Sequence, residues 1–178
     1  MRVVGGLHRG RILKRVGKPS TRETADMVKV ACFNMLQLKS GIVLDLYAGS
    51  GSYGIEALSR GAEFCHFVDS DKDAIKTVSD NLKMLKLEQQ AKVYHQSDER
   101  FIKGLSDHLM FDVIFLDPPY DDENYDIIII NLINHLNNDG YIVCESKKQV
   151  EIDLHIEGLE KIKNKTYGIK RITIFKKQ

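Results

Sequence analysis

The 178-residue chain has no tryptophan, three prolines and three cysteines. No apolar run approaches the ~20 residues of a membrane-spanning helix, and the first residues lack the apolar stretch of a secretory signal, so we expect a cytoplasmic protein without a membrane partner. Cys32, Cys65 and Cys144 are odd in number, far apart and in apolar surroundings. This pattern argues against a disulfide framework and a zinc site, and predicts three buried thiols and no bound metal.

Acidic residues are missing from both ends of the chain. Residues 1–22 carry seven lysines or arginines and residues 161–178 carry seven more, with no aspartate or glutamate in either segment. The middle, 23–160, holds 12 basic and all 25 acidic residues. Basic ends on an acidic body suggest a polyanionic partner, although terminal charge can also serve solubility alone.

The length and a hydrophobic content of 43% suit one α/β domain with a small appendage. We expect a basic hairpin over residues 1–16 and a helix over 24–38, and from residue 42 strands and helices alternate, which predicts a parallel sheet covered on both faces. Two β-prone runs near the end predict a closing hairpin with an antiparallel edge strand. The domain prediction is an appendage at 1–40 and a main domain at 41–178. The expected strands are 42–47, 63–68, 92–94, 113–116, 141–144, 159–166 and 171–175, with helices from about 53, at 71–86, 99–105 and 122–136.

A glycine-rich turn follows the first strand of the main domain. Gly49, Gly51 and Gly54 satisfy the G-x-G-x-x-G pattern, and Asp69 lies 20 residues beyond Gly49, where a ribose-binding acid belongs. This pattern alone permits NAD or S-adenosylmethionine. Asp45 favours S-adenosylmethionine, because a carboxylate suits the ammonium group of that ligand but not a pyrophosphate. The predicted cofactor residues are Asp45, Tyr47, Ala48, Gly49, Ser50, Gly51, Gly54, Asp69, Ser70 and Asp98.

The apolar run 114–116 leads directly into Asp117-Pro118-Pro119-Tyr120, which is the most informative segment of the chain. An exocyclic amine of a nucleobase is a poor nucleophile, so its lone pair must be aligned toward an electrophile. The Asp117 carboxylate and the Pro118 carbonyl can each accept one N–H of the amine, and consecutive prolines hold both acceptors in place. Tyr120 offers a ring on which the base can stack. If the strand before Gly49 lies beside the strand before Asp117, the two loops meet at one edge of the sheet.

With these motifs placed, the chain closely resembles the bacterial small-subunit ribosomal RNA guanine-N2 methyltransferase family, nearly end to end. The matching segments are Arg9-Gly10-Arg11, Thr24, Asp26, Val28, Phe33-Asn34, 45–54, Glu56 to Gly61, Phe111-Asp112, 117–120 and Thr166-Tyr167-Gly168. The sequence departs from the family at Glu23, Met27 and Val30 in the first predicted helix, where the family typically has Pro, a basic residue and Glu.

The resemblance implies a Rossmann-like methyltransferase fold with a mostly parallel seven-stranded sheet. It also implies methyl transfer from S-adenosylmethionine to the 2-amino group of one guanine, of the 966 type, in 16S rRNA on assembled or nearly assembled small subunits, by a monomer. Asp117, Pro118, Pro119 and Tyr120 would form the catalytic segment. Candidate RNA contacts are Arg9, Arg11, Arg22 and Tyr167, and the departures bear on how the first helix contacts RNA, since Glu23 adds negative charge.

Two alternatives remain at this point. Asp-Pro-Pro-Tyr also suits adenine-N6 methyltransferases of DNA or RNA, although the DNA enzymes usually carry a target-recognition insertion for which this chain has no room. A noncatalytic ribosome-assembly factor could retain the cofactor fold as an RNA-binding module, but a damaged glycine loop or a lost Asp117 would be its signature, and the sequence has neither.

Overall fold

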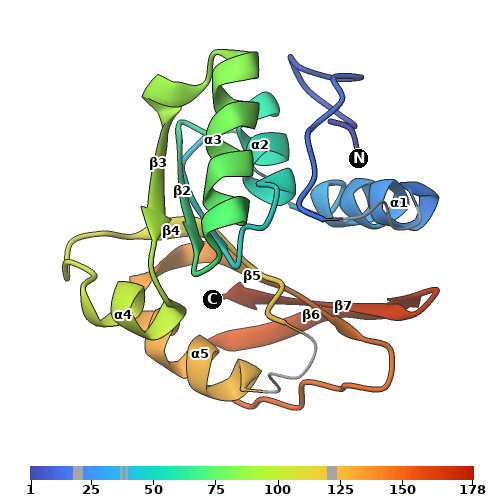
Figure 1. Cartoon of the computed structure of the whole chain (residues 1–178). Helices are drawn as coiled ribbons and strands as arrows, with labels where there is room; N and C mark the ends of the chain where they lie inside the picture. Colours follow the sequence, from blue (N-terminus) through green and yellow to red (C-terminus); the bar gives the residue numbers. More distant parts are fainter. Residues whose placement is uncertain (18–21, 37, 39, 120–123) are drawn as a thin grey trace.

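The computed structural model describes residues 1–17, 22–36, 38, 40–119 and 124–178, with side chains of the first helix described from Asp26 onward. Its centre is a seven-stranded sheet in the order β3-β2-β1-β4-β5-β7-β6 (Figure 1). The pairs among the first five strands are parallel, whereas β7 pairs antiparallel with both β5 and β6. The mostly parallel sheet and its C-terminal antiparallel hairpin are therefore confirmed. The strands are β1 Ile42–Leu46, β2 Phe64–Asp69, β3 Ala91–His95, β4 Phe111–Leu116, β5 Leu136–Lys147, β6 Leu159–Tyr167 and β7 Lys170–Lys177.

Helices cover both faces of this sheet, and side-chain alternation along each strand divides the core into two layers. Val43 and Phe115 belong to the layer that packs against α1, α2 and α3, whereas Leu44 and Ile114 belong to the layer that packs against α4 and α5. All three cysteines are free and buried, as expected. The helices are α1 Arg22–Phe33, α2 Ser52–Ser59, α3 Lys72–Leu85, α4 Asp98–Lys103 and α5 Tyr125–Leu132, with short 3-10 helices η1 Glu88–Gln90 and η2 Ile133–His135. No helix in the described part of the chain is long and apolar enough to cross a membrane.

Some boundaries differ from the sequence-based prediction. The expected helix over 24–38 ends at Phe33, and the described part of the expected helix over 122–136 is α5 followed directly by the 3-10 helix η2, which ends at His135. In contrast, β5 runs from Leu136 to Lys147, well beyond the predicted 141–144. Residues 145–147 pair with β7, and Leu136 pairs with Phe111 of β4 before a shift in register. Hydrophobic periodicity could not reveal the extension at the carboxyl end, since the buried side chains there, Glu145 and Ser146, are polar.

The N-terminal segment forms the expected hairpin in a short form: Arg2 and Ile12 make an antiparallel bridge, and the Val3 N–H donates to the Arg11 carbonyl at 3.0 Å. The segment is also fixed to α2. The Val4 N–H donates to Glu56 Oε2 at 2.8 Å, and the Leu7 N–H donates to the Ser59 carbonyl at 2.7 Å. The side chains of Val3 and Leu13 enter the same core layer as α1 and α2. The segment thus shares the core of the main sheet, and the proposed boundary near residue 40 stays a prediction.

Candidate active site and adjoining groove

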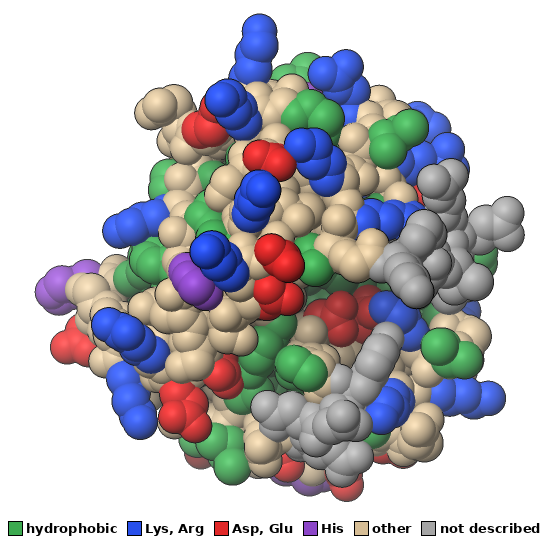
Figure 2. Space-filling view, viewed as in Figure 1, with side chains coloured by type: hydrophobic (Ala, Val, Ile, Leu, Met, Phe, Trp, Pro, Cys, Tyr) green, Lys and Arg blue, Asp and Glu red, His purple; other side chains and the backbone are tan. Residues whose placement is uncertain are grey.

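The two motifs singled out in the sequence lie at one edge of the sheet. β1 lies between β2 and β4, and Leu46 is paired with both Val68 and Leu116. The loops that follow β1, β2 and β4 therefore leave the sheet at the same level. Figure 2 shows a recess in the middle of this face, with acidic side chains inside it and lysine and arginine side chains around it. Ligands of open α/β sheets bind at such carboxyl ends of strands.

The glycine loop is shaped by left-handed backbone and by contacts with β2. Gly49 and Gly51 have φ of 53° and 76°, which non-glycine residues rarely adopt. The Gly49 N–H donates to Asp69 Oδ2 at 2.8 Å, so the strand-end acid holds the loop in place. A Cβ on Gly49 would meet no atom within 4 Å, whereas one on Gly54 would lie 2.3 Å from the Phe67 ring. Gly54 therefore allows α2 to pack closely on the sheet, and Gly49 leaves open space where a ligand can approach.

Asp45 contributes mainly to the local structure. Its side chain is buried and Oδ2 accepts the Gly54 N–H at 2.8 Å, which ties β1 to the first turn of α2. Burial raises the pKa of Asp45 to about 8, and the negative charges of Asp117 and Asp69 add to the rise. The predicted contact with the ammonium group of a bound cofactor stays a prediction.

The remaining cofactor candidates surround the glycine loop. Asp98 Oδ2 accepts the Tyr47 hydroxyl at 2.6 Å, and Ser97 caps α4. Asp69 and Asp98 thus lie on either side of the loop with both carboxylates half-buried. Ser50 is buried and its hydroxyl donates to Met1 Sδ at 3.2 Å, so this side chain contacts the N-terminal segment. Ala48 is buried as well, whereas Ser70 is exposed at the end of β2.

The loop that follows β4 begins with Asp117, and we call it the acceptor loop because the sequence predicts that it holds the amine that accepts the methyl group. No described residue donates a hydrogen bond to the Asp117 carboxylate, in contrast to Asp45 and Asp69. Desolvation raises the pKa of Asp117 to about 6, against the lowering effect of the positive charge on Lys170. Pro118 is buried and Pro119 exposed, and Tyr120 lies outside the described residues. When it is ionised, the Asp117 carboxylate is available as an acceptor.

Sequence reasoning missed a buried cluster next to Asp117. Glu145, on β5, is 4% exposed, and its Oε2 accepts the Tyr53 hydroxyl at 2.6 Å. Its Oε1 accepts a hydrogen bond from Lys170 Nζ, and its backbone carbonyl accepts the Tyr125 hydroxyl at 2.7 Å. The Tyr53 ring stacks on Phe115 with centroids 4.9 Å apart. The only signal in the sequence was the position of Glu145 directly after an apolar strand, because its partners come from distant elements.

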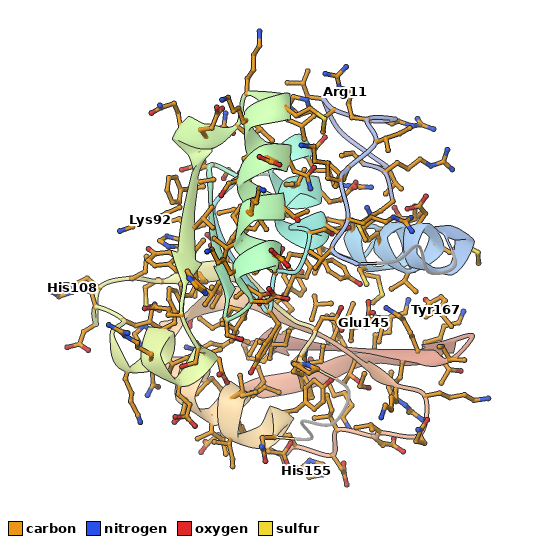
Figure 3. The ribbon with its side chains drawn as sticks, viewed as in Figure 1. Arg11, Lys92, His108, Glu145, His155 and Tyr167 are labelled. Carbon is orange, nitrogen blue, oxygen red and sulfur yellow. The ribbon has the colours of Figure 1, made fainter. Side chains whose placement is uncertain are left out.

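A groove lies beside this edge, between the N-terminal segment, α1 and β6. It encloses about 1140 Å³ and Arg9 and Tyr167, two of the predicted RNA contacts, line it. Arg11 is exposed nearby but does not line the groove, and the side chain of Arg22 lies outside the described ones. Figure 3 shows Arg11 and Tyr167 on the same side of the molecule, above and below α1. The groove floor is partly apolar, with Met27 and Val30 exposed on α1.

The described residues contain no cluster of three histidine, cysteine or acidic side chains that could hold a metal ion. A glycine loop held by a strand-end acid suits a ligand with a ribose. The Asp-Pro-Pro loop on the neighbouring strand suits a second molecule that carries an amine. Together the Rossmann-like sheet with its C-terminal antiparallel hairpin and this edge define the class of S-adenosylmethionine-dependent methyltransferases.

Comparisons with known proteins agree with this class. The chain belongs to the family described as Conserved hypothetical protein 95, which matches residues 1–176. It is 43% identical to YlbH of Bacillus subtilis (strain 168), provisionally named an rRNA methyltransferase, over the whole length of both chains. It is 36% identical to Ribosomal RNA small subunit methyltransferase D of Haemophilus influenzae, over 95% of this chain and 90% of that protein. A solved structure from Escherichia coli, provisionally described as the methyltransferase YhhF, superposes with a TM-score of 0.84 at 26% identity, covering 100% of this chain and 98% of that one.

Proposed function

We propose that this protein transfers the methyl group of S-adenosylmethionine to the exocyclic 2-amino group of a guanine in 16S rRNA, of the 966 type. The observation that carries the proposal is the Asp117 carboxylate, half-buried and without a hydrogen-bond donor among the described residues, one strand away from the glycine loop. Relatives named as rRNA methyltransferases and the resemblance noted in the sequence support ribosomal RNA as the substrate.

The glycine loop and its flanking acids would hold the cofactor. Asp69 would accept hydrogen bonds from ribose hydroxyls and Asp98 from the adenine amino group, while the open side of Gly49 admits the ligand. When bound, S-adenosylmethionine supplies an electrophilic methyl group on a positively charged sulfur.

The acceptor loop would orient the amine. Asp117 and the Pro118 carbonyl each accept one N–H, so the nitrogen lone pair points toward the methyl group and reactive geometry is held in advance. The nitrogen forms its bond to the methyl carbon as the carbon–sulfur bond breaks, and the electron pair of that bond goes to sulfur. The methylated amine then loses a proton to Asp117 or to water, which is easy because the cation is strongly acidic. Tyr120 would stack on the base.

The groove would receive the RNA near the target base. Arg9 and Arg11 would contact phosphates and Tyr167 would contact a base or ribose, with Arg22 a further candidate phosphate contact. We further propose that the protein acts as a cytoplasmic monomer, on small subunits that are assembled or nearly so.

A tritiated-methyl assay tests the proposal. Small subunits that lack the modification, naked 16S rRNA and duplex DNA are offered as substrates, and the labelled product is digested to nucleosides. We expect label in N2-methylguanosine, with small subunits as the best substrate. Label in N6-methyladenine would favour the adenine alternative, and cofactor binding without transfer to any of the three would favour a noncatalytic assembly factor.

A further inference from the structure

The buried cluster around Glu145 has no part in the mechanism above, yet it lies against the acceptor loop. Glu145 is the residue of β5 that follows Cys144, and Cys144 is paired with Leu116 directly before Asp117. Figure 3 shows Glu145 beneath α1, toward the centre of the molecule from Tyr167. The cluster is therefore placed beside the group that would orient the amine.

Glu145 uses both carboxylate oxygens to fix other side chains. One accepts the Tyr53 hydroxyl, and Tyr53 belongs to the first turn of the helix that follows the glycine loop. The other accepts from the ammonium of Lys170, at the start of β7. A buried acid with two partners of this kind is well satisfied, and it restricts the flexible lysine to one position.

Lys170 carries the positive charge nearest to the acceptor site in this cluster. Its side chain is 23% exposed, and its positive charge lowers the pKa of the Asp117 carboxylate. An ammonium has three N–H donors, and among the described residues Glu145 accepts from it. A donor beside Asp117 matches the Watson–Crick edge of guanine, which presents the 2-amino group and, further along, the 6-oxo acceptor.

We propose that Lys170, held by Glu145, is a specificity-determining residue that donates a hydrogen bond to the 6-oxo group of the target guanine. This inference rests on the proposed guanine-N2 activity. Asp117 and Pro118 hold the amine at position 2 but do not contact position 6, whereas a fixed cationic donor accepts guanine, with an oxygen at position 6, and disfavours 2,6-diaminopurine, which carries an amino group there.

The test compares two bases in two enzymes. The nucleotide that the wild-type protein methylates is replaced by 2-aminopurine, which keeps the 2-amino group and lacks the 6-oxo group. Initial rates of methyl transfer give the preference for guanine in the wild type and in Lys170→Met. The analogue also lacks the N1 hydrogen, but that loss is common to both enzymes and cancels in the ratio of preferences.

We expect the preference for guanine to fall by about tenfold or more in Lys170→Met, in line with the loss of one charge-assisted hydrogen bond. Lys170→Arg retains much of the preference, because it keeps a cationic donor. Lys176→Met, at the other end of β7 in an ion pair with Asp139, leaves the preference unchanged. An equal preference in the wild type and in Lys170→Met would overturn the inference.

Two further measurements keep the test interpretable. Lys170→Met leaves a buried acid without its cation, so the double variant Glu145→Gln/Lys170→Met provides a neutral cluster if the single variant is unstable. The double variant is expected to show the same reduced preference, and wild-type preference in it would contradict the inference.

Hypoxanthine at the target, which keeps the 6-oxo group and lacks the amine, tests the proposed function itself. Its methylation by the wild type would reject guanine-N2 transfer rather than the role of Lys170.

Discussion

The glycine loop after β1, which would hold the methyl donor, and the acceptor loop after β4 leave the sheet at the same edge. The carboxylates beside the two loops differ in the hydrogen bonds that they accept. Asp69 accepts a backbone N–H of the glycine loop and Asp45 accepts one from the first turn of α2, so the backbone around the loop holds its shape without a ligand. On the acceptor side no described residue donates a hydrogen bond to Asp117, whose pKa is raised to about 6 by desolvation. The difference shows that Asp45 and Asp69 hold the local backbone, and it agrees with the proposal that Asp117 accepts a hydrogen bond from the substrate.

The largest expected effect separates these two roles. Asp117→Ala removes the acceptor of one amine N–H, and we expect the rate of methyl transfer to fall by about 100-fold or more. The dissociation constant of the cofactor, measured by calorimetry, changes less than twofold because the donor loop is intact. The control Asp126→Ala changes an exposed acid on α5 and keeps wild-type activity. A variant of Asp117 that transfers methyl groups normally would remove this residue from the acceptor site.

A second prediction concerns the basic side of the groove. In Arg9→Ala/Arg11→Ala we expect weaker RNA binding. The slope of log affinity against log salt concentration should also become shallower, by about one for each lost phosphate contact. Cofactor affinity stays normal. The matched pair Lys92→Ala/Lys103→Ala removes two charges from β3 and α4, and its salt dependence stays that of the wild type. An unchanged slope in the arginine variant would place the RNA elsewhere.

Tyr167 is expected to have a smaller effect. Loss of its ring in Tyr167→Ala should lower kcat/KM on RNA about fivefold through KM, which corresponds to about 1 kcal/mol, the lower end of the range for stacking of one base on an aromatic ring. Tyr167→Phe keeps the ring and serves as the control, with near-normal KM. Equal loss in both variants would assign the effect to the hydroxyl instead of stacking.

The smallest effect is a pH dependence of stability on the donor side. The folded-state pKa of Asp45 is raised from 3.8 to about 8, so its protonated form is favoured in the fold. The contribution of Asp45 to the free energy of unfolding is full below its unfolded-state pKa of 3.8 and is lost as the pH rises through its folded-state pKa of about 8. Without cofactor, the melting temperature should therefore decline between pH 5 and pH 8, and less so in Asp45→Asn than in the exposed-site control Asp107→Asn. Identical declines in both variants would contradict the role of Asp45.

The sequence predicted the parts of the molecule that depend on local pattern. Strand and helix alternation, the glycine turn and the strand before Asp117 were all visible in consecutive residues, and the neighbouring positions of β1 and β4 are confirmed. The Glu145 cluster was not predictable, because Tyr53, Glu145 and Lys170 come from three elements that only the tertiary fold brings together. The carboxyl end of β5 was also hidden, since the buried side chains there are polar.

The central claim is that one loop presents the methyl donor directly to the amine held by the other. A crystal structure with S-adenosylmethionine or its demethylated product tests this most directly. The account predicts the ligand over Gly49, with its ribose at Asp69 and its sulfur directed toward Asp117 and Pro118, leaving room for an amine within about 3–3.5 Å of the methyl carbon. A ligand bound in the groove between the N-terminal segment and β6, or a sulfur directed away from Asp117, would contradict it.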